Sequence, residues 1–147
     1  MCYRCDYMSL LEDHDLNYTP NRFRILEIIG KSSYPLNARE IFENVSRTQD
    51  VNRVTVYRIL VLLTEKKLVE RLSSGDRSFR YGLAPNANHR HHPHFYCTNC
   101  GKMECLSPDI LHLNLESLER TFPGVIEKVE IRLDGICKNC MKDQKNQ

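Results

Sequence analysis

The spacing of apolar residues predicts a first helix from Thr19 to Ile29, where they recur at helical intervals. Thr19 is a residue type that caps helix N-termini, and Pro20 suits the first turn, where its missing N–H is not needed. Gly30 follows directly and is expected to end the helix. The sequence therefore supplies both a start signal and a stop signal for this element.

Two further helices and a hairpin are expected after it. Asn37 is an expected cap for a helix over Ala38–Ser46, and Asn52 begins a helix that reaches Lys66. Two short alternating runs, Leu68–Leu72 and Ser78–Tyr81, flank a glycine-containing turn, which is typical of a β-hairpin. Three helices and a hairpin predict a winged helix-turn-helix, with the third helix as the recognition helix.

The second half of the chain has the pattern of a small α/β domain. A polar segment that begins near Pro85 lacks periodicity and is expected to be a hinge. Strands, a helix and a long alternating strand are expected after it, at His92–Cys97, Lys102–Leu106, Pro108–Thr121 and Val125–Leu133. We therefore expect an α+β chain with a winged-helix domain at 1–84, a hinge at 85–91 and a dimerisation and metal-binding domain at 92–147.

Two Cys-x-x-Cys pairs, Cys97 with Cys100 and Cys137 with Cys140, suggest a zinc site. Four thiolates complete a tetrahedral shell, with Zn–S bonds of about 2.3 Å, and leave no position for water or substrate. The sequence therefore predicts one structural zinc ion. Two disulfides or free thiols are the alternative. No secretory signal or membrane-spanning apolar run is evident, so a reducing cytosol is expected, which favours zinc.

The charge is nearly balanced, with 21 basic and 19 acidic residues. The small positive excess lies in residues 1–84, which hold 13 Lys/Arg against 11 Asp/Glu, whereas residues 85–147 hold eight of each. This margin does not establish nucleic-acid binding, but it indicates the first half as the place to look for it. Two domains of this size have modest cores, so zinc and dimerisation are expected to support them.

Four motifs, in this order, resemble the ferric uptake regulator superfamily of bacterial metal-responsive repressors. They are Thr19-Pro20-Asn21-Arg22 with Ile25-Leu26, Thr55-Val56-Tyr57-Arg58 with Leu60, the histidine-rich stretch before Cys97-x-x-Cys100-Gly101, and Gly135-x-Cys137-x-x-Cys140. The resemblance covers nearly the whole chain. It implies a cytoplasmic homodimer that binds double-stranded operator DNA when a regulatory metal occupies the hinge. No membrane and no small organic substrate is expected as a partner.

A second set of metal-ligand residue types lies beside the expected hinge. Residues two apart in a strand share a face, so His92 and His94 point together. A hairpin about the first cysteine pair places position 105 opposite them, which brings the Cys105 thiol to the two imidazoles. We expect these three residues to bind the regulatory metal. The alternative is a small core cysteine beside solvated histidines.

Departures from the family pattern bear on the identity of that metal. Iron- and peroxide-sensing members usually combine the two histidines with carboxylates, whereas this chain has Cys105 at the second-strand position and no carboxylate near Gly82. A thiolate favours Zn(II) over Fe(II) or Mn(II). The chain is therefore most similar to the zinc uptake regulator branch, with an iron-sensing repressor as the alternative. The candidates for a fourth ligand are His89 first, then Glu70 and Asp76.

Two other groups of possible ligands are incomplete. A further site in some family members would here contain His91 and His112, but its other two positions hold no ligand types, so a full second regulatory site is not expected. Cys2 and Cys5 form a third Cys-x-x-Cys pair without a scaffold. Residues before Met8 are expected to be an upstream extension or a flexible tail.

The expected DNA contacts are Arg22, Arg53, Thr55, Tyr57 and Arg58. Arginine can read guanine bidentately, and Thr and Tyr hydroxyls can hold phosphate or pack on thymine methyls. Core packing is the alternative role for Tyr57, and a solvated charge is the alternative for Arg58. Metal at the hinge is expected to select the dimer geometry in which both recognition helices meet adjacent major-groove segments.

A thiol redox enzyme and a zinc hydrolase are the rival classes. Redox dithiols normally lie at a helix start after a strand, whereas here Gly101 follows Cys100 and both pairs lie at the ends of expected strands, which is typical of zinc knuckles. A hydrolase would need an open zinc and an acid/base pair, and the sequence has no His-Glu-x-x-His motif. We therefore expect a regulator and not an enzyme.

Overall fold

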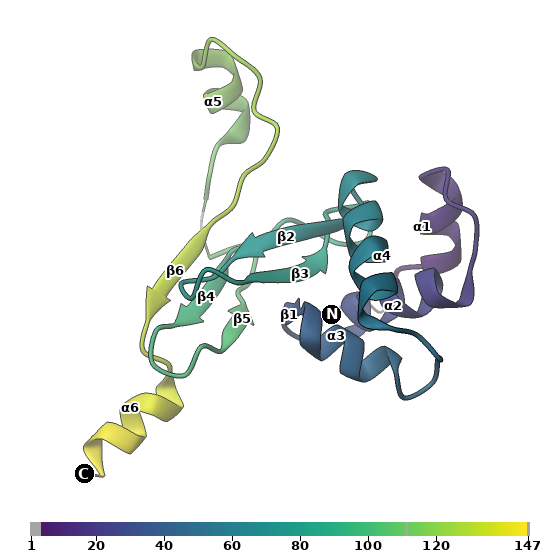
Figure 1. Ribbon diagram of the computed structural model, residues 1–147. Coiled ribbons are helices and arrows are strands. Elements are labelled where there is room, and N and C mark those ends of the chain that lie inside the picture. The colour runs from purple at the N-terminus through teal and green to yellow at the C-terminus, as the bar shows by residue number, and fades with distance from the viewer. Residues whose placement is uncertain (1–3, 111, 147) are drawn as a thin grey trace. The chain divides into compact units, whose positions relative to one another are not determined.

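The computed structural model describes residues 4–110 and 112–146 and has the expected α+β composition, with helices and two small sheets (Figure 1). The chain divides into two compact units, Met1–His91 and His92–Gln147, called here the first and the second unit. Within the described residues, no helix combines the length and the apolar character needed to cross a bilayer.

Four helices form most of the first unit: α1 (Tyr7–Asp13), α2 (Pro20–Lys31), α3 (Ala38–Val45) and α4 (Arg53–Glu65). The three caps expected from the sequence are present. The side-chain oxygens of Thr19, Asn37 and Asn52 each accept a backbone N–H three residues on, at 3.1, 2.8 and 2.8 Å. These bonds satisfy N–H groups that have no partner within their helix.

The start of the first unit differs from the expectation in two respects. Gly30 lies inside α2, which ends one residue later at Lys31, and the ring of Tyr7 packs where a side chain at position 30 would stand. Residues 5–7 are not a flexible tail either: Asp6 caps α1 and Tyr7 is buried. Packing of α1 on α2 is a tertiary contact, which the local sequence pattern does not reveal. Cys2 lies outside the described residues, and Cys5 packs against the core of this unit.

A small antiparallel sheet completes the first unit. The expected hairpin is present as β2 (Val69–Ser73) and β3 (Phe79–Leu83), and an additional short strand, β1 (Leu36–Asn37), pairs with β3 to give the order β1-β3-β2. Helices and sheet enclose one apolar core, whose fully buried members are Leu11, Ile25, Leu26, Ile41, Val45, Leu60 and Leu63. Three helices with a hairpin wing form a winged helix-turn-helix, as the sequence predicts.

The second unit is built on one three-stranded sheet. Its strands are β4 (His94–Cys97), β5 (Met103–Cys105) and β6 (Arg132–Gly135), in the order β5-β4-β6. Strand β5 runs antiparallel to β4, and β6 runs parallel to it. Helix α6 (Lys138–Lys145) follows β6 directly. Strand β4 is therefore the central strand and positions residues from both neighbours.

The segment between β5 and β6 is less regular than its sequence pattern predicts. Helix α5 spans Leu115–Thr121, where Asn114 caps it, and does not begin at Pro108. Residues 125–131 form no strand within the unit, although their apolar residues alternate, and regular pairing begins only at Arg132. None of the residues of α5 is buried, and Val125 is 85% exposed. The apolar residues of this segment are thus left largely exposed by the described part of the second unit.

Candidate metal centres and nucleic-acid interface

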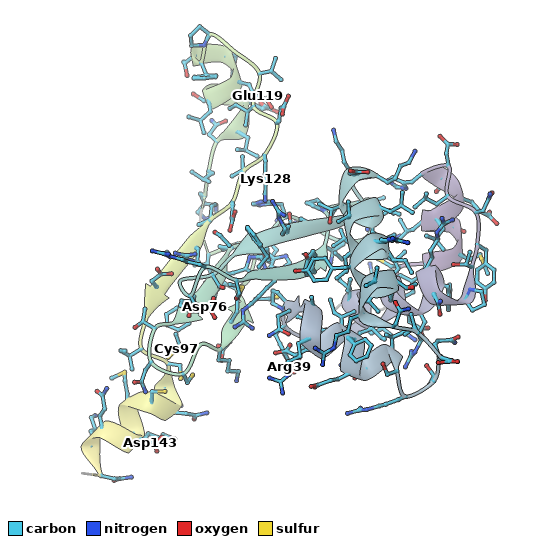
Figure 2. All side chains as sticks on the ribbon, viewed as in Figure 1. Arg39, Asp76, Cys97, Glu119, Lys128 and Asp143 are labelled. Carbon is cyan, nitrogen blue, oxygen red and sulfur yellow. The ribbon has the colours of Figure 1, made fainter. Side chains whose placement is uncertain are left out.

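The four paired cysteines converge in the second unit. Their sulfur atoms all lie within 4.8 Å of one another, and two cross-pair distances, Cys97 to Cys140 and Cys100 to Cys137, are both 3.9 Å. Figure 2 labels Cys97, the last residue of β4. All four are free thiols, so no disulfide competes for them. Sulfur atoms bound to one tetrahedral zinc ion are separated by similar distances, given Zn–S bonds of about 2.3 Å. The structure therefore brings together a complete four-thiol metal site.

Backbone geometry around the first pair creates this arrangement. Gly101 adopts a φ of 76°, which glycine accepts without strain, and its N–H donates to the Cys97 carbonyl at 2.9 Å. The N–H of Thr98 donates to the Gly135 carbonyl at 2.8 Å, which ties the turn to the end of β6. Parallel pairing of β4 with β6 therefore delivers Cys137 to the site.

Backbone N–H groups also prepare the site electrostatically. The N–H of Cys100 and then that of Cys137 donate to the Cys97 sulfur, at 3.5 and 3.3 Å, and they lower the pKa of this thiol to about 6. Hydrogen bonds of this kind favour the thiolate, which is the form that binds metal. The fold thus stabilises a ligand anion before any metal arrives.

A second cluster joins His92, His94 and Cys105. One ligand atom from each lies within 4.8 Å of the other two, and the imidazole centroids are 4.7 Å apart. The cause is strand register: His94 is directly opposite Cys105 in the antiparallel β4–β5 pair, as the hairpin argument predicts. His94 is buried, and the other two are half-buried. Two imidazoles and a thiol are thus close enough together to supply three ligands to one ion.

Other candidate ligands have different surroundings. The Asp76 carboxylate accepts hydrogen bonds from Ser74 and Ser78 in the β2–β3 turn, and these bonds hold its pKa well below the usual range. That oxygen is already engaged by the hairpin, which disfavours Asp76 as a metal ligand. Within the described residues, His91 and His112 belong to neither cluster of three or more converging ligands. His89 pairs through its backbone with Asn86, and its role as a ligand stays a prediction.

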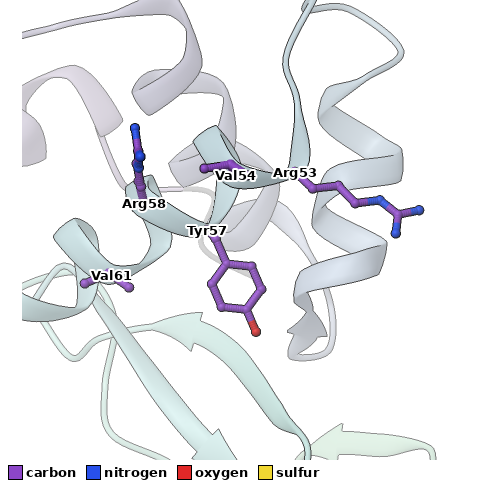
Figure 3. Close-up of a pocket in the computed structure, with 5 residues that line it drawn as sticks. All are labelled: Arg53, Val54, Tyr57, Arg58 and Val61. Atoms are coloured by element: carbon purple, nitrogen blue, oxygen red, sulfur yellow. The ribbon is translucent and has the colours of Figure 1, made fainter.

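The expected recognition helix, α4, presents its charged and aromatic residues to solvent. Tyr57 is 58% exposed, so it is not a core residue, and Figure 3 shows Arg53, Tyr57 and Arg58 pointing outward in different directions. Thr55 lies in the first turn, where its N–H is capped by Asn52. Arg22 lies at the start of α2 and donates to the Asn17 carbonyl at 3.0 Å. The helix is anchored from behind by Val56, Leu60 and Leu63, which are buried.

Two exposed residues of α4 are absent from the contacts expected from the sequence. Val54 is 58% exposed and Val61 is 50% exposed, and with Arg53, Tyr57 and Arg58 they line a hollow of about 420 Å³ (Figure 3). A signal was present: apolar residues extend around α4 beyond the stripe that a half-buried helix needs. The surplus apolar residues are those on the outward face.

The sequence model of the Ferric uptake regulator family matches residues 13–132. The chain belongs to this family. A curated relative, the ferric uptake regulation protein of Bacillus subtilis, is 30% identical over 131 residues, which cover 86% of this chain and 88% of the relative.

Solved structures of family proteins have the same fold. The Helicobacter pylori ferric uptake regulator, whose structure is described as having three functional metal-binding sites, matches with a TM-score of 0.74 at 19% identity, over 96% of this chain and 97% of that chain. A zinc uptake regulator in complex with zinc and DNA matches with a TM-score of 0.61 at 19% identity, over 93% and 91%. At these identities the likeness shows the fold alone, including the winged helix of the first unit.

Proposed function

We propose that this family member, a metal-responsive transcriptional regulator, is a zinc-dependent repressor that binds operator DNA as a homodimer in the bacterial cytoplasm. One zinc ion is structural and is held by the four-cysteine site. A second, regulatory zinc ion binds His92, His94 and Cys105, with His89 as the proposed fourth ligand. Its binding favours the dimer geometry that fits DNA.

The observation that carries the choice of zinc is the position of Cys105. Its thiol lies with two imidazoles in a cluster whose ligand atoms are all within 4.8 Å of one another. Sulfur with nitrogen donors suits Zn(II), whereas Fe(II) and Mn(II) in regulatory sites favour more oxygen ligands.

An iron-dependent repressor is the second candidate. It is favoured by the curated relatives, several of which, including the Bacillus subtilis protein, are named ferric uptake regulation proteins. The two candidates share the fold, the structural zinc and the DNA surface. They differ only in the ion that fills the histidine–cysteine cluster.

Dimerisation is supported by the unsatisfied surface of the second unit. Leu115, Leu118, Phe122 and Val125 are 40%, 44%, 54% and 85% exposed, and β6 is an edge strand with an open side. Exposed apolar patches and unpaired strand edges mark association surfaces. We assign this surface to a second copy of the chain, which would also complete the alternating segment 125–131 as a strand.

A metal titration of DNA binding tests the proposal. The protein, with its structural zinc retained and the cluster emptied by mild chelation, is titrated anaerobically with Zn(II), Fe(II) and Mn(II) against a duplex selected from a random library. We expect Zn(II) to activate binding at the lowest free concentration. Activation by Fe(II) at lower concentration would favour the second candidate. A chain that holds no zinc and selects no duplex would contradict the whole proposal.

A further inference from the structure

The outward face of α4 has an apolar stripe. Val54, Tyr57 and Val61 are 58%, 58% and 50% exposed. They are spaced by three and four residues, so they lie on one face of the helix, one above the other. Single exposed apolar residues are ordinary on protein surfaces. Three in a row, bordering one hollow of about 420 Å³, are a continuous surface (Figure 3).

Neither folding nor solubility accounts for valine at these positions. A β-branched side chain has a lower helix propensity than alanine, lysine or glutamate, which would serve an exposed position better. The inner face of α4 already supplies the core contacts, through Val56, Leu60 and Leu63. The two exposed valines add nothing to that core, so a partner that buries them is the remaining physical reason for their presence.

The border of the stripe indicates the chemistry of that partner. Arg53 and Arg58 complete the lining of the hollow, and no carboxylate takes part in it. Cationic groups around an apolar centre match a partner with anionic edges and small apolar groups between them. The major groove of DNA has this composition: phosphates border it, and the C5-methyl of each thymine projects into it.

We propose that Val54, with Val61, selects thymine in the operator by packing on its C5-methyl groups, beside Tyr57, for which such packing is already an expectation from the sequence. This rests on the proposed function, because it specifies how the same recognition helix distinguishes bases. Arg53 and Arg58 hold the helix in the groove through phosphate or guanine contacts, and the apolar stripe supplies discrimination for thymine. Val54 is nearest the N-terminal end of α4, the end whose residues reach base edges in helix-turn-helix proteins, so it has the largest effect.

Replacement of thymine by deoxyuridine tests the proposal, because it removes only the methyl group and keeps every hydrogen bond of the base pair. A duplex is first selected from a random library with the metal-loaded full-length protein. Each thymine in it is then replaced singly, and affinity is measured by fluorescence anisotropy. For the parent protein we expect at least one position to weaken binding about fourfold, the factor that corresponds to one buried methyl group.

The protein variants Val54→Ala, Val61→Ala and Arg58→Ala are compared on the same duplexes. In Val54→Ala, the loss of affinity on deoxyuridine replacement should disappear at the thymine that Val54 contacts, because the alanine side chain is too short to reach the methyl group. In Val61→Ala, the loss of affinity at the thymine that Val61 contacts should become smaller. All three positions are exposed, and alanine favours the helix, so the variants should fold. Arg58→Ala is the matched control: it should weaken binding to thymine and deoxyuridine duplexes by the same factor.

Equal affinity of the parent for every deoxyuridine duplex would overturn the proposal, as would full methyl sensitivity in Val54→Ala. Either result leaves the proposed repressor function intact, because a duplex was still selected and bound. Failure to enrich any duplex is a different outcome, which would contradict the proposed function and this inference with it.

Discussion

The two units of the chain are stabilised by different means. The buried apolar cluster, which includes Leu11, Ile25 and Leu60, belongs to the first unit. In the second unit the buried apolar residues within the described ranges are Pro93, Tyr96, Cys97, Met103 and Cys140, and two of these five are candidate metal ligands. The first unit therefore folds by burial of apolar surface, whereas we expect the second to depend on the proposed metal ligation and on the proposed partner.

This difference has a functional meaning for a metal-responsive protein. A DNA-binding unit with its own core keeps its shape whether or not metal is present. Its affinity for DNA can therefore be changed by repositioning the whole unit, without a change in its fold. A unit that relies on ligands responds directly to metal supply. Substitutions in one unit should therefore leave the other intact, and each prediction below uses this separation.

The largest effect is expected from loss of the four-cysteine site. Replacing Cys97, Cys100, Cys137 or Cys140 with serine should release one tightly held zinc ion and unfold or monomerise the second unit, because metal-binding energy is folding energy in small metal-bound domains. Native mass spectrometry reports zinc content and dimer mass. Hydrogen exchange should still show protected amides in α2 and α4. Normal zinc content and dimer mass in all four variants would show that the second unit does not depend on this site.

The next effect separates the two clusters within the second unit. Cys105→Ser should keep the structural zinc and the dimer but lose zinc-activated DNA binding, because a neutral hydroxyl is a poor substitute for a thiolate. A Co(II) titration checks the ligand directly, since thiolate ligation gives an intense near-ultraviolet band. The same band from the second equivalent in Cys105→Ser and in the parent would mean that Cys105 is not a ligand.

Cys105→Asp is the informative companion to that variant. A carboxylate restores an anionic ligand but is harder than sulfur, so the metal response should shift toward Fe(II) and Mn(II). The measurement is the same anaerobic DNA-binding titration with three metals. An unchanged preference for Zn(II) would show that the other ligands of the site determine the metal.

A smaller effect is expected from a packing change in the first unit. A methyl group added at Gly30 would lie 2.7 Å from Cζ of Tyr7, so Gly30→Ala should destabilise this unit by about 1–3 kcal/mol. Gly82→Ala is the control, because its added methyl would meet only Leu72, at an ordinary 3.7 Å. Thermal unfolding measures both, and zinc content should not change. Equal melting temperatures for the two variants would show that Tyr7 does not pack against Gly30.

The smallest effects concern the DNA surface. Arg58→Ala should weaken operator binding and reduce the salt dependence by about one counterion if the guanidinium contacts phosphate. Tyr57→Phe should weaken binding by removing one hydroxyl contact. Both residues are exposed, so fold and zinc content should be retained. Unchanged affinity and salt slope in an anisotropy titration would indicate another recognition surface.

Local signals predicted the parts of the fold that local interactions determine. Capping by Thr19, Asn37 and Asn52 is a contact over three residues, so the sequence alone located the starts of α2, α3 and α4. Register in a short hairpin is equally local, and it correctly placed Cys105 opposite His94. The histidine–cysteine cluster follows from such reasoning. The four-cysteine cluster joins segments 40 positions apart, and it was predicted from its two Cys-x-x-Cys motifs and not from local structure.

Contacts between distant segments were not predictable in this way. Helix α1 packs on α2 through the contact of Tyr7 with Gly30, which lies 23 positions later in the chain. Residues 125–131 have the alternation of a strand, but pairing needs an edge, and within the described second unit β6 begins only at Arg132. Val54 and Val61 were overlooked because apolar residues on a helix are first assigned to the core.

Strand β4 is only four residues long, yet it carries His94 for one cluster and Cys97 for the other. The two proposed metal sites therefore share one short strand. We expect them to load in a fixed order, because zinc in the four-cysteine site would hold this strand in the position that the histidine–cysteine cluster needs. This order of loading would mean that newly made protein responds to metal only after it has bound a first zinc ion at the four-cysteine site. In a Zn(II) titration we expect the four-cysteine site to fill first, so protein with one zinc ion should not hold it at the histidine–cysteine cluster. Simultaneous filling of both sites would contradict this order.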